Sequence, residues 1–198
     1  MVGAGTSKTQ RTSILTLDGG GNLVVNGAMK PNGGQDYAEY LEWLDGNLNN
    51  EIRTGRFVTL VEDKIALAQA GDDVIGIISA TPCILGNASE LRWNNRYLKD
   101  EFGATIYEEF INEDNELDTR PVENPNYDPA MKYIPRSQRP EWAPVGFMGQ
   151  IIMLHDGTCT VGGYCAPGVD GIATSSSEKT NCRVMKVIDE THILVLLK

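Results

Sequence analysis

Two carboxylates three residues apart stand out in this sequence as groups that could do acid–base chemistry. They are Asp36 and Glu39, in the segment Asp36-Tyr37-Ala38-Glu39. On a helical turn, residues at this spacing lie on one face, so the two carboxylates would be neighbours. Paired carboxylates among aromatic side chains can take different pKa values, so that one stays protonated as an acid and the other is ionised as a base. Such a pair could activate a water molecule against a nearby carbonyl group.

The same spacing also has a purely structural explanation, because an acidic first turn stabilises the dipole of a helix. Residues 36–43 fit two turns of helix with Tyr37, Tyr40 and Leu41 near one face, but tyrosines suit a strand equally well. Lys30-Pro31-Asn32-Gly33-Gly34, directly before this segment, is a cluster of helix- and strand-breaking residues and the best linker candidate in the chain.

Other chemistries find little support. The chain has no GxSxG, P-loop, HExxH or strand-following GxGxxG motif, and the glycines at 19–21 precede no helical pattern, so they indicate a turn. With only two histidines and no zinc-type spacing, the cysteines are interpreted as reduced structural thiols, and no metal site is expected. The four cysteines are Cys83, Cys159, Cys165 and Cys182.

Short strands are expected on both sides of the carboxylate pair. Residues 14–17 and 23–27 indicate two strands joined by a glycine-rich turn, after a frayed segment at 1–12. Such a small hairpin is not stable alone, and copies of itself in an oligomer could support it. Further hairpins are expected at 56–68, around Glu62-Asp63, and at 182–197, around Asp189-Glu190-Thr191.

Residues 87–140 have little periodicity, which is typical of a lid or an interaction arm. Their aromatic residues argue against a disordered segment, and we expect neighbouring subunits to cover most of them. These aromatics are Trp93, Tyr97, Phe102, Tyr107, Phe110, Tyr127 and Tyr133.

The composition of the chain excludes some classes of partner and favours one fold class. The 198 residues suit one domain with a short arm, and a net charge of -10 repels nucleic-acid phosphates, so no nucleic-acid partner is expected. No apolar run approaches the length of a membrane span, so no membrane partner is expected. With 21 Gly and 9 Pro, the chain favours many short strands. The predicted fold is mainly β: a barrel- or sandwich-like globular domain with a long irregular aromatic insertion, preceded by a short β-stem segment.

The string DYAEYLEW at 36–43 resembles the start of the autoproteolytic intramolecular chaperone domain found at the C-terminus of phage neck-appendage and tail-spike proteins, a family classed as a glutamic peptidase. The resemblance covers nearly all of 36–198. It extends through Gly55-Arg56-Phe57-Val58, Asp73-Val74-Ile75-Gly76-Ile77, Tyr97-Leu98-Lys99-Asp100-Glu101-Phe102-Gly103, Tyr133-Ile134-Pro135-Arg136, residues 139–146 and Asp156-Gly157-Thr158-Cys159.

The resemblance implies a self-cleaving endopeptidase that acts once. It places the cleaved bond at Gln35–Asp36 and makes Glu39 the catalytic glutamate, with Asp36 as a candidate acid for the leaving amine. The family carries a small residue before the aspartate. This chain carries Gln35 there, which is expected to slow or abolish cleavage.

The residues themselves favour a carboxylate mechanism over its rivals. Intein-like processing needs Ser, Thr or Cys just after the bond, and residue 36 is Asp. Cyclisation of the Asn32 side chain onto its own backbone would be slow, and it would break a bond that lies three bonds upstream of Gln35–Asp36. The mechanism that remains is attack by a water molecule that Glu39 activates. It also requires a hydrogen-bond donor to the carbonyl oxygen of the cleaved bond. The candidates for this donor are Arg136, Arg139, Gln150 and His155, among which the sequence does not choose.

The resulting hypothesis assigns 1–35 to the end of a trimeric fibre stem plus linker, and 36–198 to the autoproteolytic intramolecular chaperone. The chaperone would assemble a homotrimer with its upstream stem in the host cytoplasm and then leave, so that the stem stays in the virion tail. No cofactor is required for the cut, and the resemblance implies ATP as a release trigger. The alternatives are a non-cleaving fibre tip that binds a host receptor through 87–140, and a plain trimerisation domain.

Overall fold

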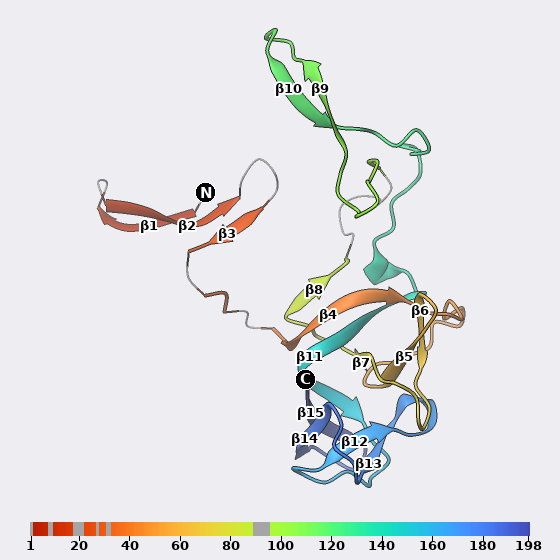
Figure 1. The fold of residues 1–198 in the computed structure, drawn as a ribbon. Coiled ribbons are helices and arrows are strands. Elements are labelled where there is room, and N and C mark those ends of the chain that lie inside the picture. Colours follow the sequence, from red (N-terminus) through yellow and green to blue (C-terminus); the bar gives the residue numbers. More distant parts are fainter. Residues whose placement is uncertain (1, 8–9, 18–21, 27, 31–32, 89–95) are drawn as a thin grey trace. The chain divides into compact units, whose positions relative to one another are not determined.

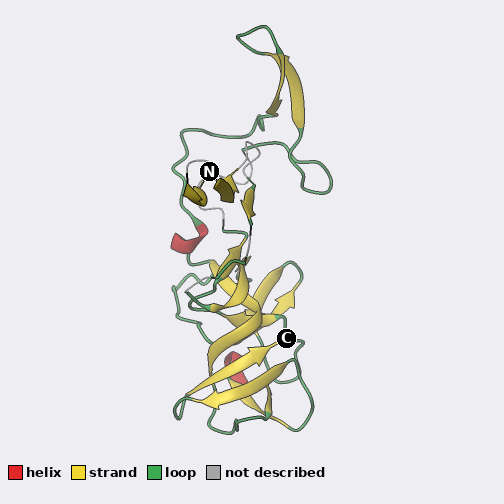
Figure 2. Cartoon of the chain, turned by 90° about the vertical axis from the view of Figure 1, so that its left-hand side faces the viewer, coloured by secondary structure: helices red, strands yellow, loops and turns green. Residues whose placement is uncertain are grey.

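The chain divides into two compact units, Met1–Gly34 and Gln35–Lys198, each of which is described by itself (Figure 1). The structure is a computed structural model that describes all residues except 1, 8–9, 18–21, 27, 31–32 and 89–95. Strands predominate throughout, and the two described helices are single 3-10 turns, η1 (Arg136–Gln138) and η2 (Val169–Gly171) (Figure 2). Neither is long or apolar enough to cross a membrane.

The first unit is a three-stranded antiparallel sheet in the order β1-β2-β3. Its strands are β1 (Val2–Ser7), β2 (Gln10–Leu17) and β3 (Leu23–Val25). The expected strand at 14–17 falls within β2, and the expected strand at 23–27 overlaps β3, which ends at Val25. The expectation of a frayed segment at 1–12 was wrong for its described residues, because 2–7 form β1 and 10–12 begin β2, and these two strands pair with each other.

The second unit is built on a ten-stranded sheet that curls into a half-barrel, which confirms the mainly β prediction. Its main path runs β13-β12-β14-β15-β11-β7-β5-β6, and β4 pairs with both β11 and β8. The strands are β4 (Gln35–Glu42), β5 (Phe57–Val61), β6 (Lys64–Leu67), β7 (Gly76–Ile78), β8 (Ile84–Gly86), β11 (Trp142–Leu154), β12 (Tyr164–Pro167), β13 (Ala173–Ser176), β14 (Cys182–Val187) and β15 (His192–Leu197).

Both hairpins expected in this unit are present. The first joins β5 to β6 through a tight turn in which Glu62 has a φ of 56°. The second joins β14 to β15 at the C-terminus, where buried and half-buried residues alternate along His192–Leu197. Short apolar runs on either side of a polar turn are the signal that made these two hairpins predictable.

The long strand β11 connects two clusters of buried side chains. One cluster gathers around Phe57, Met153 and Ile193, and the other around Trp43 and Val145. Because successive strand residues point to opposite faces, a strand with both faces covered can contribute to both clusters. The strands that pack against β11, including β4, are therefore held on a well-buried frame.

The aromatic insertion is more regular than expected. It contains a hairpin of β9 (Tyr107–Ile111) and β10 (Leu117–Pro121), with Asn115 at a φ of 62° in the turn region. The sequence did not indicate these strands, because charged residues interrupt their apolar alternation. Trp93 lies outside the described residues.

Candidate active site

The segment that carries Asp36 and Glu39 is a strand, not a helical turn. In β4, Gln35 pairs with Gln150 and Asp36 with Gly149 of β11, while the other edge of β4 pairs with β8 in parallel. The backbone N–H of Cys83 donates to the Asp36 carbonyl at 2.9 Å. The cut site predicted from the family resemblance thus starts a strand that is hydrogen-bonded along both edges.

This strand corrects the expectation that the two carboxylates share a face. Residues three apart in a strand point to opposite sides, so Asp36 and Glu39 diverge. The helical alternative fails here because β11 pairs with residues 35–42 and β8 pairs with residues 37–39 from the other side, which outweighs the weak local preference of the sequence.

Asp36 is a buried carboxyl, with 3% of its surface exposed. Ser79, itself buried, forms a hydrogen bond to this carboxyl, and Oδ2 has no hydrogen-bond partner among the described residues. Burial raises the pKa of Asp36 above its ordinary value, and the bond from Ser79 offsets part of that rise. Burial therefore shifts this carboxyl towards the protonated form, which is the form a general acid needs.

Glu39 belongs to a second pair on the opposite face. The Tyr37 hydroxyl donates to Glu39 Oε1, and this bond raises the pKa of Tyr37 because it stabilises the protonated phenol. Gly86 of β8 leaves room for the pair, since a Cβ there would lie 2.9 Å from Glu39 Cγ and 3.2 Å from the Tyr37 hydroxyl. Tyr37 thus orients the carboxylate of Glu39.

Gly149 packs directly against the predicted cut site. Its φ is +116°, and a Cβ at this position would lie 2.3 Å from the Gln35 carbonyl oxygen and 2.7 Å from Asp36 Cα. A residue with a side chain would be strained there and would also push the bond away. The close approach of β11 to Gln35–Asp36 therefore depends on glycine.

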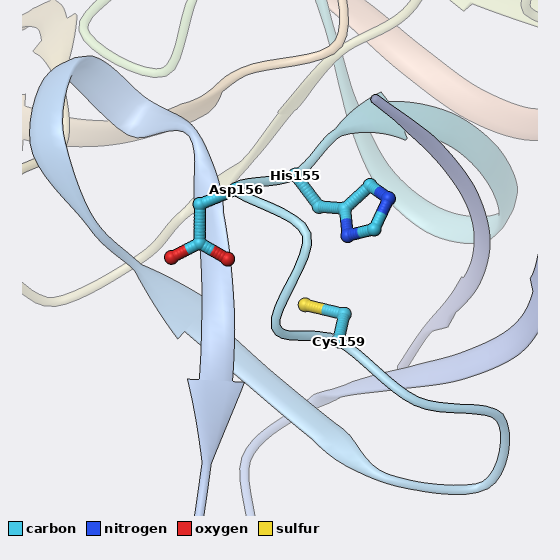
Figure 3. Close-up of side chains that lie close together, drawn as sticks. All are labelled: His155, Asp156 and Cys159. Atoms are coloured by element: carbon cyan, nitrogen blue, oxygen red, sulfur yellow. The ribbon is translucent and has the colours of Figure 1, made fainter. Parts of the chain in front are cut away.

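The four candidate donors for the carbonyl oxygen are spread over the unit. Gln150 lies in register with Gln35. Arg136 and Arg139 stack on Trp142, at 3.8 Å and 5.4 Å, and Trp142 pairs with Glu42 at the far end of β4. His155 lies in the turn after β11, where its Nε2 is 3.2 Å from the Asp189 carbonyl oxygen (Figure 3). The register therefore brings Gln150 alone of these four beside Gln35.

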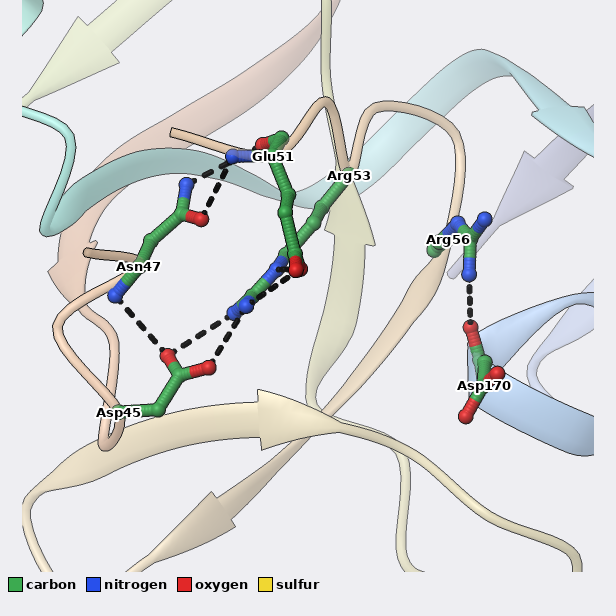
Figure 4. A network of polar contacts seen from close by, with 6 residues as sticks. All are labelled: Asp45, Asn47, Glu51, Arg53, Arg56 and Asp170. Carbon is green, nitrogen blue, oxygen red and sulfur yellow. Dashed lines mark hydrogen bonds and ion pairs between the residues drawn. The ribbon is translucent and has the colours of Figure 1, made fainter. Parts of the chain in front are cut away.

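A fully paired cluster occupies the turn that follows β4 (Figure 4). The Arg53 guanidinium is 2.6 Å from Asp45 and 2.8 Å from Glu51, and it lies 4.6 Å from the Trp43 ring. Asn47 donates to and accepts from the Glu51 backbone. The hydrogen bond from Arg53 lowers the pKa of Asp45.

The thiols are free, as the sequence indicated. Cys165 and Cys182 are buried with their sulfur atoms 3.2 Å apart, on strands β12 and β14. Burial raises the pKa of Cys159 to about 12.

Sequence reasoning missed the partners of the two carboxylates: Ser79, Tyr37, Gly86 and Gly149. The alternation of Tyr37 and Glu39 was a usable signal for their pairing, once a strand is assumed. Ser79 and Gly149 gave no local signal, because each is brought to β4 by pairing between distant segments.

Comparison with known proteins identifies a family for nearly the whole chain. The family model described as Peptidase_G2, IMC autoproteolytic cleavage domain, matches residues 4–192. The preneck appendage protein of Bacillus phage PZA is 41% identical over 152 residues, which is 77% of this chain and 17% of that protein. The pre-neck appendage protein of Bacillus phage phi29 is 45% identical over 139 residues, 70% of this chain and 16% of that protein. The chain thus spans about a sixth of the length of these relatives.

Two solved structures share the fold. Pre-mature bacteriophage phi29 gene product 12 superposes with a TM-score of 0.83 at 36% identity, over 93% of this chain and 24% of that one. The phi29 gene product 12 C-terminal fragment superposes with a TM-score of 0.70 at 39% identity, over 82% of this chain and all of that one.

Proposed function

The chain belongs to the Peptidase_G2 family of IMC autoproteolytic cleavage domains, and we propose that it cuts its own backbone between Gln35 and Asp36. In this proposal Glu39 is the catalytic carboxylate and Asp36 is the general acid. The observation that carries the proposal is the buried Asp36 carboxyl, with one oxygen unpartnered and its pKa raised by burial. A carboxyl with a raised pKa beside a peptide bond is suited to supply the proton that the leaving amine needs.

The proposed step is a single hydrolysis. Glu39 takes a proton from water, and the water oxygen attacks the Gln35 carbonyl carbon. The bond from that carbon to the Asp36 nitrogen then breaks, and the Asp36 carboxyl protonates the nitrogen as it leaves as an amine. Gln150, which lies in register with Gln35, is the proposed donor to the carbonyl oxygen.

Strand geometry favours a second copy of the chain as the source of the carboxylate. Glu39 is four residues beyond Gln35, about 13 Å along a strand that rises about 3.3 Å per residue. That is further than a glutamate side chain and one water can span, so Glu39 does not reach its own bond while β4 is formed. We therefore assign the base to Glu39 of a neighbouring subunit.

An apolar row beside the cut site supports such a contact between copies. Tyr37 is in register with Ile84 on one side and Met148 on the other, and both of these aliphatic side chains are exposed. Exposed apolar residues that run across adjacent strands are typical of a subunit contact. A trimer joined near this row would place the strand β4 of one subunit close to that of the next.

The extent of the C-terminal fragment supports the position of the cut. The proposed piece, residues 36–198, contains 163 of the 198 residues, or 82% of the chain. The solved phi29 fragment matches in full and over the same share of this chain. The first unit, which contains a small sheet and ends at Gly34, is then proposed to be the end of a phage appendage stem.

We propose that residues 36–198 hold three chains in register while the stem forms. Pairing between chains is slow, and a globular trimer raises the local concentration of the stem strands. Removal of the chaperone then leaves the assembled stem kinetically trapped. In this scheme the chaperone is released in the host cytoplasm, the stem stays in the virion, and ATP as the release trigger stays a prediction.

Intact mass of the purified chain tests the cut. We expect slow or no cleavage with Gln35 in place, and two fragments that separate between residues 35 and 36 in the Gln35→Ser variant. A Gln35→Ser chain that stays whole, or that is cut at another bond, contradicts the proposed function.

Mixed subunits test which copy supplies the base. A size-tagged chain with Gln35→Ser and Glu39→Gln is co-expressed with an untagged chain that has Gln35→Ser alone. If a neighbour supplies the base, the tagged chain is cut in mixed trimers. If the tagged chain stays whole while the untagged one is cut, each subunit cleaves itself.

The exposed insertion favours a second candidate function, recognition of a host receptor. Phe102 is 88% exposed, and Tyr107, Ile111 and Leu117 of the β9–β10 hairpin are also exposed. Hydrogen–deuterium exchange of the trimer separates the two readings. Slow exchange of the hairpin amides that face away from the β9–β10 pairing would indicate coverage by neighbouring subunits, whereas fast exchange of these amides in the trimer would favour receptor binding.

A further inference from the structure

Three side chains with different metal-binding atoms converge in the turn after β11. His155, Asp156 and Cys159 offer a ring nitrogen, a carboxylate oxygen and a sulfur atom, and these atoms all lie within 4.8 Å of one another (Figure 3). None of the three has a role in the proposed cleavage, apart from the early candidacy of His155 as a donor, which the register does not favour.

The imidazole of His155 is oriented as a metal ligand would be. Its Nε2 is 3.2 Å from the Asp189 carbonyl oxygen, which can only accept, so Nε2 carries the proton. Nδ1 is then the nitrogen with a lone pair, and the Gly157 N–H donates to it at a long 3.2 Å. Histidines that bind metals usually donate their other N–H to a carbonyl or carboxylate in this way.

The turn that carries the three donors is held in place by its neighbours. The Thr158 N–H and hydroxyl both donate to Asp156 Oδ1, at 3.0 Å and 2.6 Å. The Ser175 N–H donates to the Thr158 hydroxyl at 2.8 Å, and the Asp156 N–H donates to the Ala173 carbonyl at 3.0 Å. The turn is therefore tied to β13, and little rearrangement is needed to bring the donors onto one ion.

We propose that His155, Asp156 and Cys159 bind one divalent transition-metal ion of the zinc class. Sulfur and imidazole nitrogen suit Zn²⁺, whereas Mg²⁺ and Ca²⁺ prefer oxygen ligands throughout. A thiolate and a carboxylate together balance the charge of a divalent ion. Three protein ligands leave a fourth position for water, and the exposed Asp156 gives the ion a route in from solvent.

A buried core thiol is the simpler reading of Cys159, and it makes a different prediction. Cys159 belongs to the same buried cluster as Cys165 and Cys182. If packing is its whole role, the turn has no affinity for metal ions beyond that of scattered surface groups. If the three donors act together, binding has a stoichiometry of one ion per chain and requires the Cys159 sulfur.

Cobalt absorption distinguishes the two readings, because a thiolate bound to Co²⁺ gives a charge-transfer band that oxygen and nitrogen ligands do not. The purified whole chain is freed of metal with a chelator and titrated with Co²⁺ and then with Zn²⁺. We expect one Co²⁺ per chain, a thiolate charge-transfer band, and its displacement by Zn²⁺. Absence of the band at one equivalent or more overturns the proposal.

Three variants make the assignment specific to these residues. Cys159→Ser should lose the band, and Asp156→Asn should weaken Co²⁺ binding by at least about tenfold, the order seen when even a supporting partner of a ligand is removed. Cys83→Ser, at a half-buried cysteine outside the turn, is the matched control and should keep the band. A band that persists in Cys159→Ser, or disappears in Cys83→Ser, assigns the sulfur elsewhere and overturns the proposal.

Folding of the variants is checked independently. Asp156 is exposed, so Asp156→Asn is expected to keep the circular dichroism of the parent chain. If Cys159→Ser does not fold, Asp156→Asn decides alone, and unweakened binding in that variant contradicts the site. The test does not depend on self-cleavage, because Co²⁺ absorption is measured on the uncut chain.

Discussion

The start of β4 and the turn that follows this strand differ in how their aspartates are paired: Asp36 is buried, whereas Asp45 is exposed beside an arginine whose side chain is largely buried. At the proposed cleavage site, residues 35–39, Asp36 is buried, one of its oxygens has no hydrogen-bond partner among the described residues, and burial raises its pKa. In the Arg53 turn, residues 45–53, Asp45 is paired with Arg53, and its pKa is lowered. At a structural site the charged side chains have partners. A buried carboxyl with an unpaired oxygen and a shifted pKa is instead typical of a functional site.

The largest expected effect tests whether the proposed cleavage site does chemistry at all. In the Gln35→Ser background, Glu39→Gln should slow cleavage by about 10²- to 10⁴-fold, because the amide keeps the size of the side chain but cannot act as a base. Fragment appearance on a gel over time measures the rate.

Glu42→Gln in the same background is the control, since Glu42 is another carboxylate of β4 and pairs with Lys64 at 2.6 Å. It should cleave at the parent rate. Equal rates for the two variants would remove the distinction between Glu39 and an ordinary ion-paired carboxylate.

The next effect concerns Gly149, the glycine that packs against the proposed cut site. Gly149→Ala should lower the free energy of unfolding by about 2–3 kcal/mol, because it combines backbone strain with a clash against the Gln35 carbonyl. Urea unfolding of the uncut chain measures it.

Gly157→Ala separates the two causes, because Gly157 has a φ of +88° but open space around the position of a Cβ. It should cost about 1 kcal/mol from strain alone. If the free energy of unfolding falls by the same amount in both variants, close packing of Gly149 against Gln35–Asp36 contributes nothing to stability.

A smaller effect is expected in the Arg53 turn. Arg53→Ala should cost about 1–2 kcal/mol, because it removes contacts with Asp45, Glu51 and the face of Trp43. Thermal or urea unfolding measures the change in the Gln35 parent chain.

Arg120→Ala is the matched comparison. Arg120 also contacts a carboxylate, Glu108, at 2.7 Å and an aromatic ring, Phe110, at 5.0 Å, but its side chain is largely exposed. Its loss should cost less than about 1 kcal/mol. A cost as large as that of Arg53→Ala would show that burial does not set the strength of these clusters.

The smallest effect is a pair of pH dependences with opposite sign. The pKa of Asp36 is raised in the folded state above its ordinary value of 3.8. Asp36 therefore lowers the stability of the fold as the pH rises from about 3.8 through the raised pKa. Asp36→Asn should therefore gain stability relative to the parent over that range. Because the pKa of Asp45 is lowered, its stabilisation is present above 3.8 and is lost as pH falls through the lowered pKa.

Unfolding at a series of pH values measures both differences. The Asp45→Asn variant should be less stable than the parent above 3.8 and should converge with it in acid. The difference in unfolding free energy between variant and parent should rise with pH for Asp36→Asn and fall with pH for Asp45→Asn. A change in the same direction for both variants would contradict the contrast between the start of β4 and the Arg53 turn.

Several features of this protein follow from the sequence alone. Short apolar runs on either side of a polar turn predict the β5–β6 and β14–β15 hairpins, and the abundance of turn formers predicts a mainly β fold. The resemblance carried by the string at 36–43 indicates the family that comparison then confirms. These properties are local, or are written in a long motif, and they need no knowledge of distant contacts.

Tertiary structure alone decides how the candidate site is arranged. Residues 36–43 fit a helix or a strand, and pairing with β11 and β8 selects the strand, which turns Asp36 and Glu39 to opposite faces. Ser79 and Gly149 reach Asp36 only through pairing between segments far apart in the chain. The sequence determined which residues are chemically capable, and the sheet decided which of them meet, because strand register is set by non-local packing.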